Sequence, residues 1–255
     1  MTINKMTKIN QILLSQPDGV VWLASWLEKA GISRSLQEHY RKMAWFEPIG
    51  TGAYKRTGQK ITWEAGVYAL QKQALLPIHV GARTALSLQG LAHYVRTKET
   101  VFIFASKPRL VIPKWFKYYD WEVDLECYTT SFLPDESGLI AYNTNKCQIQ
   151  ISSPERAILE YLYLAPKHAD LVECYHIMQG LLTLRPQLIQ QLLESCKSIK
   201  VKRLFMYMSQ KTGHQWITDL NKEKISLGAG KRSIVAHGSY IPEYQITIPQ
   251  ELKNI

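Results

Sequence analysis

The fold of this chain is decided by residues 23–56, which read LASWLEKAGISRSLQEHYRKMAWFEPIGTGAYKR. Leu23, Trp26 and Leu27 recur at the spacing of one helical face, so the stretch is predicted to begin with a short amphipathic helix. Gly31 follows, and glycine readily takes the left-handed conformation that ends a helix. The pattern therefore predicts a helix followed by a tight turn.

A second helix is predicted directly after this turn. Ser33 or Ser35 can cap it, because a serine oxygen accepts a hydrogen bond from the free N–H groups of a first helical turn. Leu36, Tyr40 and Met43 fall at positions i, i+4 and i+7 and are expected to form its buried stripe. The polar residues left over are expected to face outward, and they are Arg34, Ser35, Gln37, Glu38, Arg41 and Lys42.

Two short strands are predicted to follow the second helix. Residues 45–49 and 53–56 resemble strands in composition, and the glycine-flanked turn at residues 50–52 joins them into a hairpin. Helix, turn, helix and hairpin in this order are typical of a winged helix-turn-helix domain, in which the hairpin is the wing.

The outward residues of the second helix favour DNA as a ligand. Arginine and glutamine side chains make paired hydrogen bonds to base edges, whereas serine, lysine and arginine hold phosphates. The alternative interpretation is an ordinary helical hairpin whose charged face is only solvated. Under the DNA-binding hypothesis, the expected contact residues are Ser33, Arg34, Ser35, Gln37, Arg41 and Lys42 of the helix and Lys55 and Arg56 of the hairpin.

The charge distribution supports a polyanionic partner. The chain has 255 residues and a formal net charge of +10. Residues 1–60 hold nine lysines and arginines against four acids, and residues 195–235 hold nine against two. The residues between these segments are nearly neutral, so the sequence contains two separate basic regions.

The second basic region is expected to form a cationic surface. Periodicity predicts a helix over residues 200–208 that leaves Lys200 and Arg203 on one exposed stripe. A glycine turn at residues 228–232 adds two cations, although its sequence departs from the phosphate-binding loop pattern at two positions. A solvated helix face is the simpler alternative. The expected functional surface consists of Lys200, Lys202, Arg203, Lys231 and Arg232.

Motifs for catalysis and metal binding are weak. The four cysteines are too far apart for a zinc knuckle, and neither a His-x-x-x-His nor a Gly-x-Ser-x-Gly pattern occurs. The acids at alternate positions from 120 to 126 are explained by a solvated strand face. We therefore expect no enzyme activity, metal or cofactor. Scattered thiols, no signal peptide and no membrane-spanning run indicate a cytoplasmic protein.

Two domains are expected. Residues 1–95 combine the winged helix-turn-helix with a helical extension, which is predicted over residues 63–76 and 81–91. Residues 96–255 begin with β-rich runs, continue with helices from Pro154 onward and end in a strand at residues 245–248. Strands followed by helices indicate an α+β domain, so the expected fold class is α+β.

Three blocks in the second half carry a specific family resemblance. They read SPERAILEYLY, LRPQLIQQLLESCKSIKVKRLFMYM and LGAGKRSIVAHGSYIPEYQITIP. With the winged helix and its extension, they resemble the AbiEi antitoxins of type IV toxin–antitoxin systems, the abortive-infection AbiE type, over residues 9–249. The three blocks are more specific than the winged helix, which occurs in many regulators. Ala44 and Ala82 depart from the family pattern, because glycine is usual at both positions.

The resemblance implies two activities. The N-terminal domain is expected to bind inverted repeats of operator DNA and repress the antitoxin–toxin operon. The C-terminal domain is expected to oppose a nucleotidyltransferase-like toxin, with direct contact between the two proteins left open. Two other interpretations remain: a stand-alone winged-helix regulator whose C-terminal domain senses a signal or mediates assembly, and a nucleic-acid enzyme.

Overall fold

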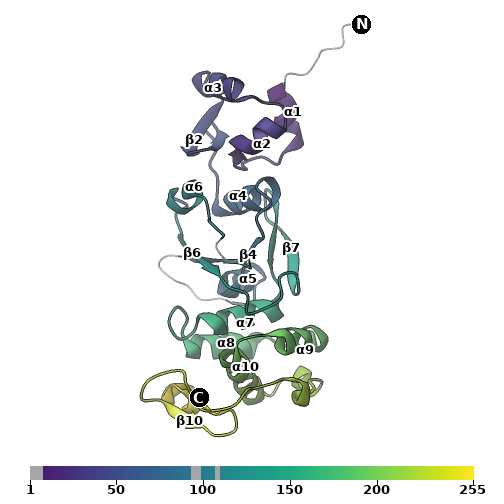
Figure 1. The fold of residues 1–255 in the computed structure, drawn as a ribbon, viewed down its shortest axis with the longest axis vertical. Coiled ribbons are helices and arrows are strands. Elements are labelled where there is room, and N and C mark those ends of the chain that lie inside the picture. The colour runs from purple at the N-terminus through teal and green to yellow at the C-terminus, as the bar shows by residue number, and fades with distance from the viewer. Residues whose placement is uncertain (1–7, 93–98, 107–109) are drawn as a thin grey trace.

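Three parts follow one another along the long axis of the molecule, which is elongated (Figure 1). The computed structural model describes residues 8–92, 99–106 and 110–255. A head of residues 8–56 forms one end, and a five-stranded sheet with helices on both faces forms the middle. Helices and a small sheet form the other end. The fold is α+β, as expected.

The head has the element order of a winged helix-turn-helix. Its strands form one antiparallel sheet in the order β1-β3-β2. Ser33 caps the second helix, since its Oγ accepts from the backbone N–H of Leu36 at 3.4 Å. The elements are α1 (Lys8–Ser15), β1 (Trp22–Leu23), α2 (Ala24–Lys29), α3 (Arg34–Lys42), β2 (Phe46–Gly50) and β3 (Ala53–Arg56).

An aromatic cluster supports α3 on the sheet. The ring of Phe46 lies 5.3 Å from Trp22, 5.4 Å from Tyr40 and 5.7 Å from Tyr54, measured between centroids. Leu36 and Tyr40 face this core, as predicted. The expectation that Met43 is buried is wrong, because α3 ends at Lys42 and the Met43 side chain is 60% exposed.

The two alanines at positions where the resemblance leads us to expect glycine occupy left-handed backbone conformations. Ala44 follows α3 and has a φ of 54°, and Ala82 begins α5 with a φ of 47°. An L-residue in this region has its Cβ close to the following carbonyl, which is unfavourable by about 1–2 kcal/mol. Glycine would adopt the same backbone conformation without this strain.

Replacing Ala44 by glycine should raise the free energy of unfolding by about 0.5–1 kcal/mol, because glycine relieves the strain but gains entropy in the unfolded chain. Ala30 provides the matched control: it is also exposed after a helix, but its φ is −79°. Urea titrations of both variants measure the effect, and Ala30→Gly should leave the free energy of unfolding unchanged or lower it. Equal effects of the two substitutions would contradict the strain at Ala44.

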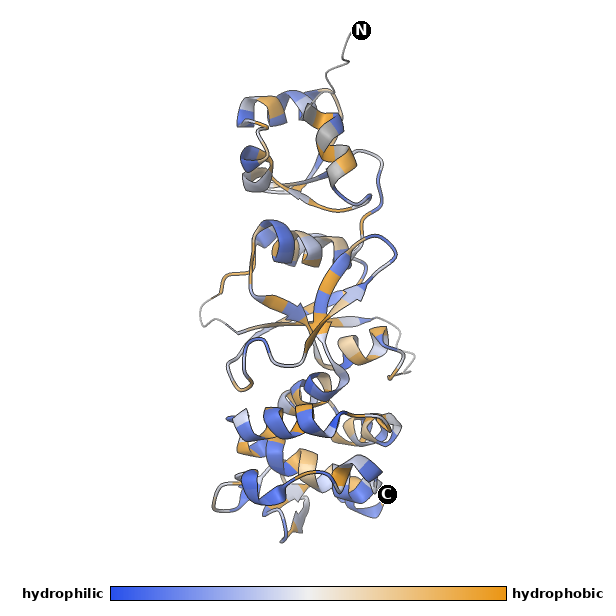
Figure 2. Cartoon of the chain, turned by 90° about the vertical axis from the view of Figure 1, so that its right-hand side faces the viewer, coloured by the Kyte–Doolittle hydropathy of each residue, from blue (hydrophilic) through white to orange (hydrophobic). Residues whose placement is uncertain are grey.

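The central sheet has the strand order β6-β5-β4-β8-β7. The pairs β5–β6 and β4–β8 are parallel, and the pairs β4–β5 and β7–β8 are antiparallel. The strands are β4 (Ile78–Val80), β5 (Thr100–Ala105), β6 (Asp124–Thr129), β7 (Leu139–Asn143) and β8 (Gln148–Ser152). Hydrophobic residues are prominent along the strands in Figure 2, and β5 is buried along nearly its whole length.

Helices cover both faces of this sheet. On the side toward the head lie α4 (Trp63–Tyr68), the π-helical turn η1 (Ala69–Gln73) and α6 (Lys114–Tyr118), whereas α5 (Ala82–Leu88) and α7 (Pro154–Leu164) cover the other side (Figure 1). Because β4 precedes residue 95 and the other strands follow it, the expected division between residues 95 and 96 passes through one continuous sheet.

The C-terminal part surrounds a central helix, α10. A three-stranded sheet in the order β10-β11-β9 covers its lower side, where the sequence predicted one strand. The elements are α8 (Leu171–Gly180), α9 (Pro186–Ser195), α10 (Ile199–Thr212), η2 (Gln215–Ile217), η3 (Lys222–Lys224), β9 (Arg232–Ser233), β10 (Ser239–Ile241), β11 (Ile246–Ile248) and α11 (Gln250–Asn254).

Candidate nucleic-acid interface

The exposed face of α3 carries the cations expected from the sequence. The Arg34 side chain is 85% exposed, and its Nε lies 2.7 Å from a carboxylate oxygen of Glu28. Arg41 is 48% exposed and pairs with Glu38 at 2.8 Å. Lys42 is exposed at the end of the helix. Surface ion pairs contribute about 0–1 kcal/mol, so both arginines can exchange a carboxylate for a phosphate or a base edge.

Gln37 lies on the opposite side of α3, and the expectation that it faces outward is wrong. Its side chain is 2% exposed, and its Nε2 donates to the carbonyl oxygens of Ala24 at 3.1 Å and Ile32 at 3.0 Å. These hydrogen bonds hold α3 against the start of α2 and the turn between the helices. The polar side chain is buried because it satisfies backbone acceptors there.

Three further polar residues lie on the exposed side of α3. Ser33 and Ser35 are both at its start, and their Oγ atoms are 3.0 Å apart. His39 is also exposed, which the sequence interpretation missed. The signal was present: Ser35, His39 and Lys42 recur at i, i+4 and i+7, which places them on one stripe.

The wing differs from a freely projecting hairpin. Lys55 pairs with Glu47 across the hairpin at 3.2 Å and its side chain is only 14% exposed, so it is less available for phosphate than expected. Arg56 is exposed. The hairpin tip reaches α6: a Cβ added at Gly50, whose φ is +147°, would lie 2.6 Å from the Cβ of Trp115.

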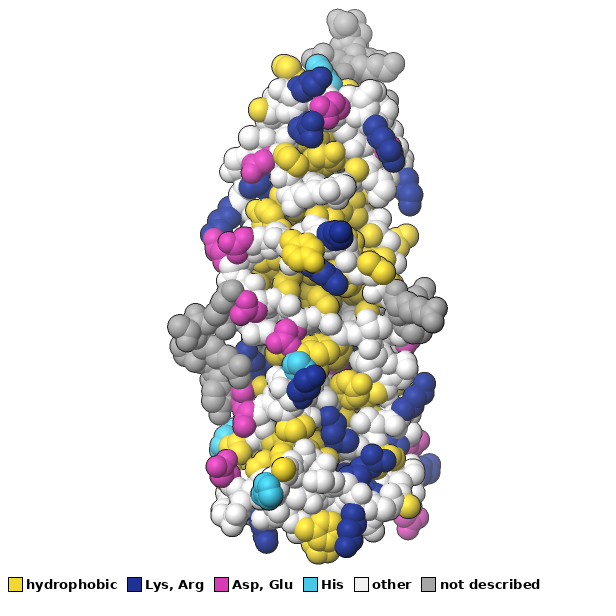
Figure 3. Space-filling view, turned by 60° about the vertical axis from the view of Figure 1, so that its left-hand side comes forward, with side chains coloured by type: hydrophobic (Ala, Val, Ile, Leu, Met, Phe, Trp, Pro, Cys, Tyr) yellow, Lys and Arg dark blue, Asp and Glu magenta, His cyan; other side chains and the backbone are white. Residues whose placement is uncertain are grey.

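The surface of this side of the molecule is shown in Figure 3. Dark blue side chains gather around the upper end, over the winged helix, and again toward the lower end. Acidic side chains, in magenta, lie among those at the upper end but are fewer than the cations. The head thus has an excess of cations over acids, although both arginines of α3 are paired with glutamates.

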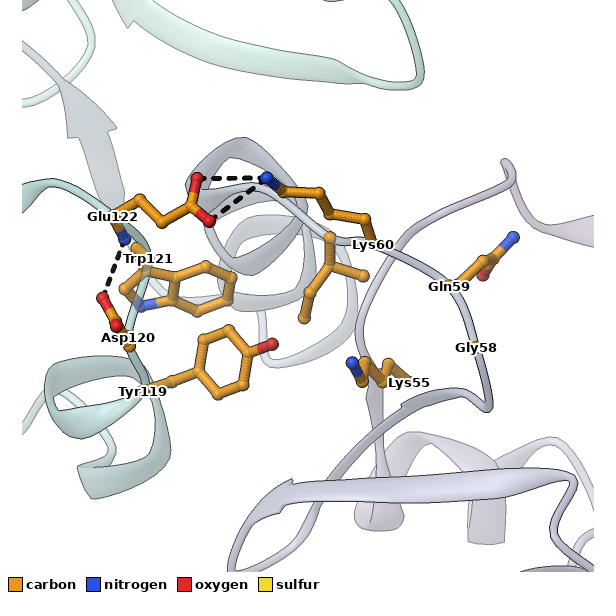
Figure 4. A pocket seen from close by; sticks show the side chains of 9 residues that line it. Lys55, Gly58, Gln59, Lys60, Tyr119, Asp120, Trp121 and Glu122 are labelled. Carbon is orange, nitrogen blue, oxygen red and sulfur yellow. Dashed lines mark hydrogen bonds and ion pairs between the residues drawn. The ribbon is translucent and has the colours of Figure 1, made fainter.

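Contacts from two sides fix the winged helix to the central sheet. The amide of Gln73, in η1, donates from Nε2 to the carbonyl of Val21 at 2.7 Å and accepts from the N–H of Leu23 at 2.8 Å. On the side of the wing, a cavity of about 300 Å³ separates residues 55–61 from residues 119–122 (Figure 4). The Lys60 ammonium closes one side of it by pairing with both oxygens of Glu122 at 3.1 Å.

Only some of the cations of the second basic region are exposed to solvent. Lys202 is 4% exposed and Arg203 is 1% exposed, so the expectation that both lie on a cationic face is wrong. α10 packs against α7, α8 and the C-terminal segment, which leaves it no fully solvated side. Lys200 is half-buried, whereas Lys231 and Arg232 are exposed.

The buried guanidinium of Arg203 donates hydrogen bonds to the backbone of the glycine turn. Its Nε donates to the carbonyl of Leu227 at 2.7 Å, and its terminal nitrogens donate to the carbonyls of Gly228, Gly230 and Gln245 at 2.7–3.1 Å. The carbonyls of the turn thus face the guanidinium. Burial, with Arg232 nearby, lowers the pKa of Arg203 from its usual value.

The described ranges contain neither a metal-binding cluster nor a membrane-spanning helix. In them, no group of three or more His, Cys, Asp and Glu side chains is placed to hold a metal ion. No helix in the same ranges is both long and apolar enough to cross a membrane.

Two sequence families match the chain nearly end to end. The family described as "Transcriptional regulator, AbiEi antitoxin N-terminal domain" matches residues 5–97. The family described as "Transcriptional regulator, AbiEi antitoxin, Type IV TA system" matches residues 98–249. The chain belongs to the AbiEi family. It is therefore a type IV antitoxin and transcriptional regulator by family.

The AbiEi fold has a counterpart among solved structures. The crystal structure of the RV2827C protein from Mycobacterium tuberculosis matches with a TM-score of 0.58 over 89% of this chain and 85% of that one. The two are 13% identical, so the similarity concerns the fold alone. A search of curated proteins gave no match. The two AbiEi matches meet between residues 97 and 98, which is between β4 and β5 of the central sheet.

Proposed function

We propose that this AbiEi antitoxin binds inverted repeats in its own promoter and represses the operon that encodes it. The observation that carries the proposal is the exposed stripe of Arg34, Arg41 and Lys42 on α3, a capped helix at one end of an elongated molecule. An exposed helix bearing arginines suits the major groove, where a guanidinium reads guanine through two hydrogen bonds.

The other contact residues have supporting positions in this proposal. Ser33 and Ser35 lie at the start of α3, where hydroxyl and N–H groups meet phosphates, and Arg56 can reach the backbone from the wing. Lys55 makes no direct phosphate contact in this proposal, because its ammonium is paired with Glu47 and is mostly buried. Gln37 positions α3 and makes no base contact.

Operator binding should weaken when the arginines of α3 are removed. Arg34→Ala and Arg41→Ala should each reduce affinity for the promoter by about 10–100-fold where the guanidinium contacts a base, with little change on unrelated DNA. Lys42→Ala and Arg56→Ala should weaken binding to any sequence and lower the salt slope of log K by about 0.9 each. Fluorescence anisotropy at several salt concentrations measures all four.

Two sets of control variants make this test specific. Lys222→Ala and Lys224→Ala remove the same charge from exposed positions in the C-terminal part and should bind the promoter normally. Gln37→Ala should instead lower the melting temperature, since it leaves two carbonyls without a donor. Normal promoter affinity in a folded Arg34→Ala, Arg41→Ala double variant would refute α3 as the reading helix.

We propose further that the C-terminal half opposes a nucleotidyltransferase-like toxin encoded beside it. This part rests on the AbiEi family and on the exposed cations of the C-terminal part, Lys231 and Arg232. Growth of cells that express the adjacent gene, with and without the full-length chain, provides the test. Rescue by the Arg34→Ala, Arg41→Ala variant, which retains the C-terminal half, separates antitoxin activity from repression.

A further inference from the structure

An open cavity of about 420 Å³ lies at the start of α10, in the C-terminal part. We call it the α10 pocket and define it by Lys197, Lys200 and Arg232 with the rings of Phe132 and Tyr163. The two rings are stacked with centroids 4.3 Å apart and an angle of 12°. The N–H of Lys197 donates to the carbonyl of Phe132 at 2.8 Å, which ties two walls of the pocket together.

The three cations of the α10 pocket come from two segments far apart in sequence. Lys197 and Lys200 flank the start of α10, and Arg232 is in β9. Within the described ranges, no carboxylate lies within ion-pair distance of any of the three. One concave surface therefore holds three cations that form no ion pair within these ranges.

The Lys200 ammonium is held by two hydrogen bonds and has one further N–H group. Its Nζ donates to the carbonyl oxygens of Tyr163, at 2.7 Å, and of Ala165, and it lies 5.4 Å from the centroid of the Tyr163 ring. These bonds use two of the three N–H groups of an ammonium. Burial lowers the pKa of Lys200, and an anion bound in the pocket would stabilise the charged form of its ammonium.

Hydroxyl groups complete the lining of the pocket. Thr130 and Ser198 each accept a backbone N–H through their side-chain oxygen, at 3.4 Å in both cases. Their O–H groups remain available to donate a hydrogen bond into the pocket. The hydroxyl of Ser131 also lines it. Cations, hydroxyl donors and a rigid aromatic wall on one concave surface suit a tetrahedral oxyanion with several acceptor oxygens.

We propose that the α10 pocket binds a phosphate group carried by a nucleotide or by the end of a nucleic-acid strand. The pocket is larger than a phosphate ion, so it also accommodates part of the attached molecule. It is distinct from the operator-binding face, because α3 lies at the opposite end of the molecule (Figure 1). Phosphate recognition here is therefore independent of the proposed repressor function.

Isothermal titration of the full-length chain tests this proposal with three probes: inorganic phosphate, ATP and a short 5′-phosphorylated single strand. At least one should bind saturably, and their order of affinity distinguishes a free nucleotide from a strand end. Saturable binding by none of them would overturn the proposal.

A charge-matched pair of double variants locates the binding. Lys197→Glu with Arg232→Glu should weaken the bound probe at least tenfold, whereas Lys222→Glu with Lys224→Glu, at exposed positions outside the pocket, should leave it unchanged. Lys197→Gln with Arg232→Gln provides a milder substitution should the first variant fold poorly. Equal weakening by the pocket and control variants would show nonspecific attraction and refute the site. Promoter affinity should stay normal in all of them.

Discussion

Replacement of Glu160 by alanine should lower the free energy of unfolding by about 3–5 kcal/mol, because the substitution leaves several buried donors without their common acceptor. The Glu160 side chain is fully buried. Its Oε1 lies 2.7 Å from Nε2 of His79 and 2.8 Å from Nε of Arg156. Its Oε2 accepts from the hydroxyl of Ser152 at 2.7 Å and from the N–H of Ala82 at 3.0 Å. One carboxylate thus joins β4, α5, β8 and α7.

The contribution of Glu160 should depend on pH. Burial alone would raise the pKa of its carboxyl, but the charges of His79 and Arg156 and the hydrogen bonds from His79 and Ser152 lower this pKa to about 2. The ordinary value for the unfolded chain is 4.5. The ionised form therefore stabilises the fold fully above the unfolded value, and its contribution of about 3 kcal/mol is lost as the pH falls from there toward the folded value.

Guanidinium titrations of the wild type, Glu160→Ala, Glu160→Gln and Glu194→Ala at a series of pH values measure the loss of stability and its dependence on pH. Glu194 is an exposed helical glutamate in α9, so its removal should change stability by no more than about 0.5 kcal/mol. The difference between the wild type and Glu160→Gln should shrink as the pH is lowered. A difference that stays constant from about pH 7 to about pH 3 would contradict the proposed role of the ionised carboxylate.

Replacement of Arg203 by methionine should release residues 227–248 from their packing against α10. The guanidinium serves four carbonyl oxygens between residues 227 and 245, and an unpaired buried acceptor is unfavourable by about 1–3 kcal/mol. Since water can satisfy these carbonyls if the segment detaches, we expect local opening before global unfolding. Backbone amides of residues 228–234 and 245–248 should then exchange their hydrogens at least tenfold faster.

Arg232→Met is the matched control for Arg203→Met, because it removes the same group from an exposed position in the same segment. Its exchange rates should remain close to those of the wild type. Arg203→Lys should fail to restore protection, since one ammonium cannot supply the planar set of donors that reaches all four carbonyls. Unchanged protection in Arg203→Met would show that the segment is held by its other contacts.

The elements near the quoted stretch could be predicted because their signals act over a few residues. The sequence offered Ser33 or Ser35 as the cap of α3, and the helix begins at Arg34 with Ser33 as its cap. The glycine turn placed β3 at residues 53–56. The exposure of Arg34, Arg41 and Lys42 followed from the same local pattern. The roles of these residues in DNA binding remain predictions.

The errors at Gln37 and Arg203 share one physical cause, which is that carbonyl groups distant in sequence can hold a polar side chain inside the fold. Gln37 and Arg203 look outward on a helical wheel, but backbone acceptors brought together by the fold hold them inside. The periodicity argument assumed that α10 has one solvated side, and α10 instead lies at the centre of its part. The pairing of His79 with Glu160 joins residues 81 positions apart, which no local pattern reveals.

The position of β4 also constrains the order in which the nascent chain can fold. β4 pairs with β5 on one edge and with β8, at residues 148–152, on the other. During translation all three strands of the head have been synthesised by residue 56. The strand Ile78–Val80 is synthesised before either of its partners, so it remains unpaired until they follow. An unpaired strand edge is a template for association with other chains. Ribosomal pausing between β4 and β8 would therefore prolong the stage at which a folded head is attached to an aggregation-prone edge.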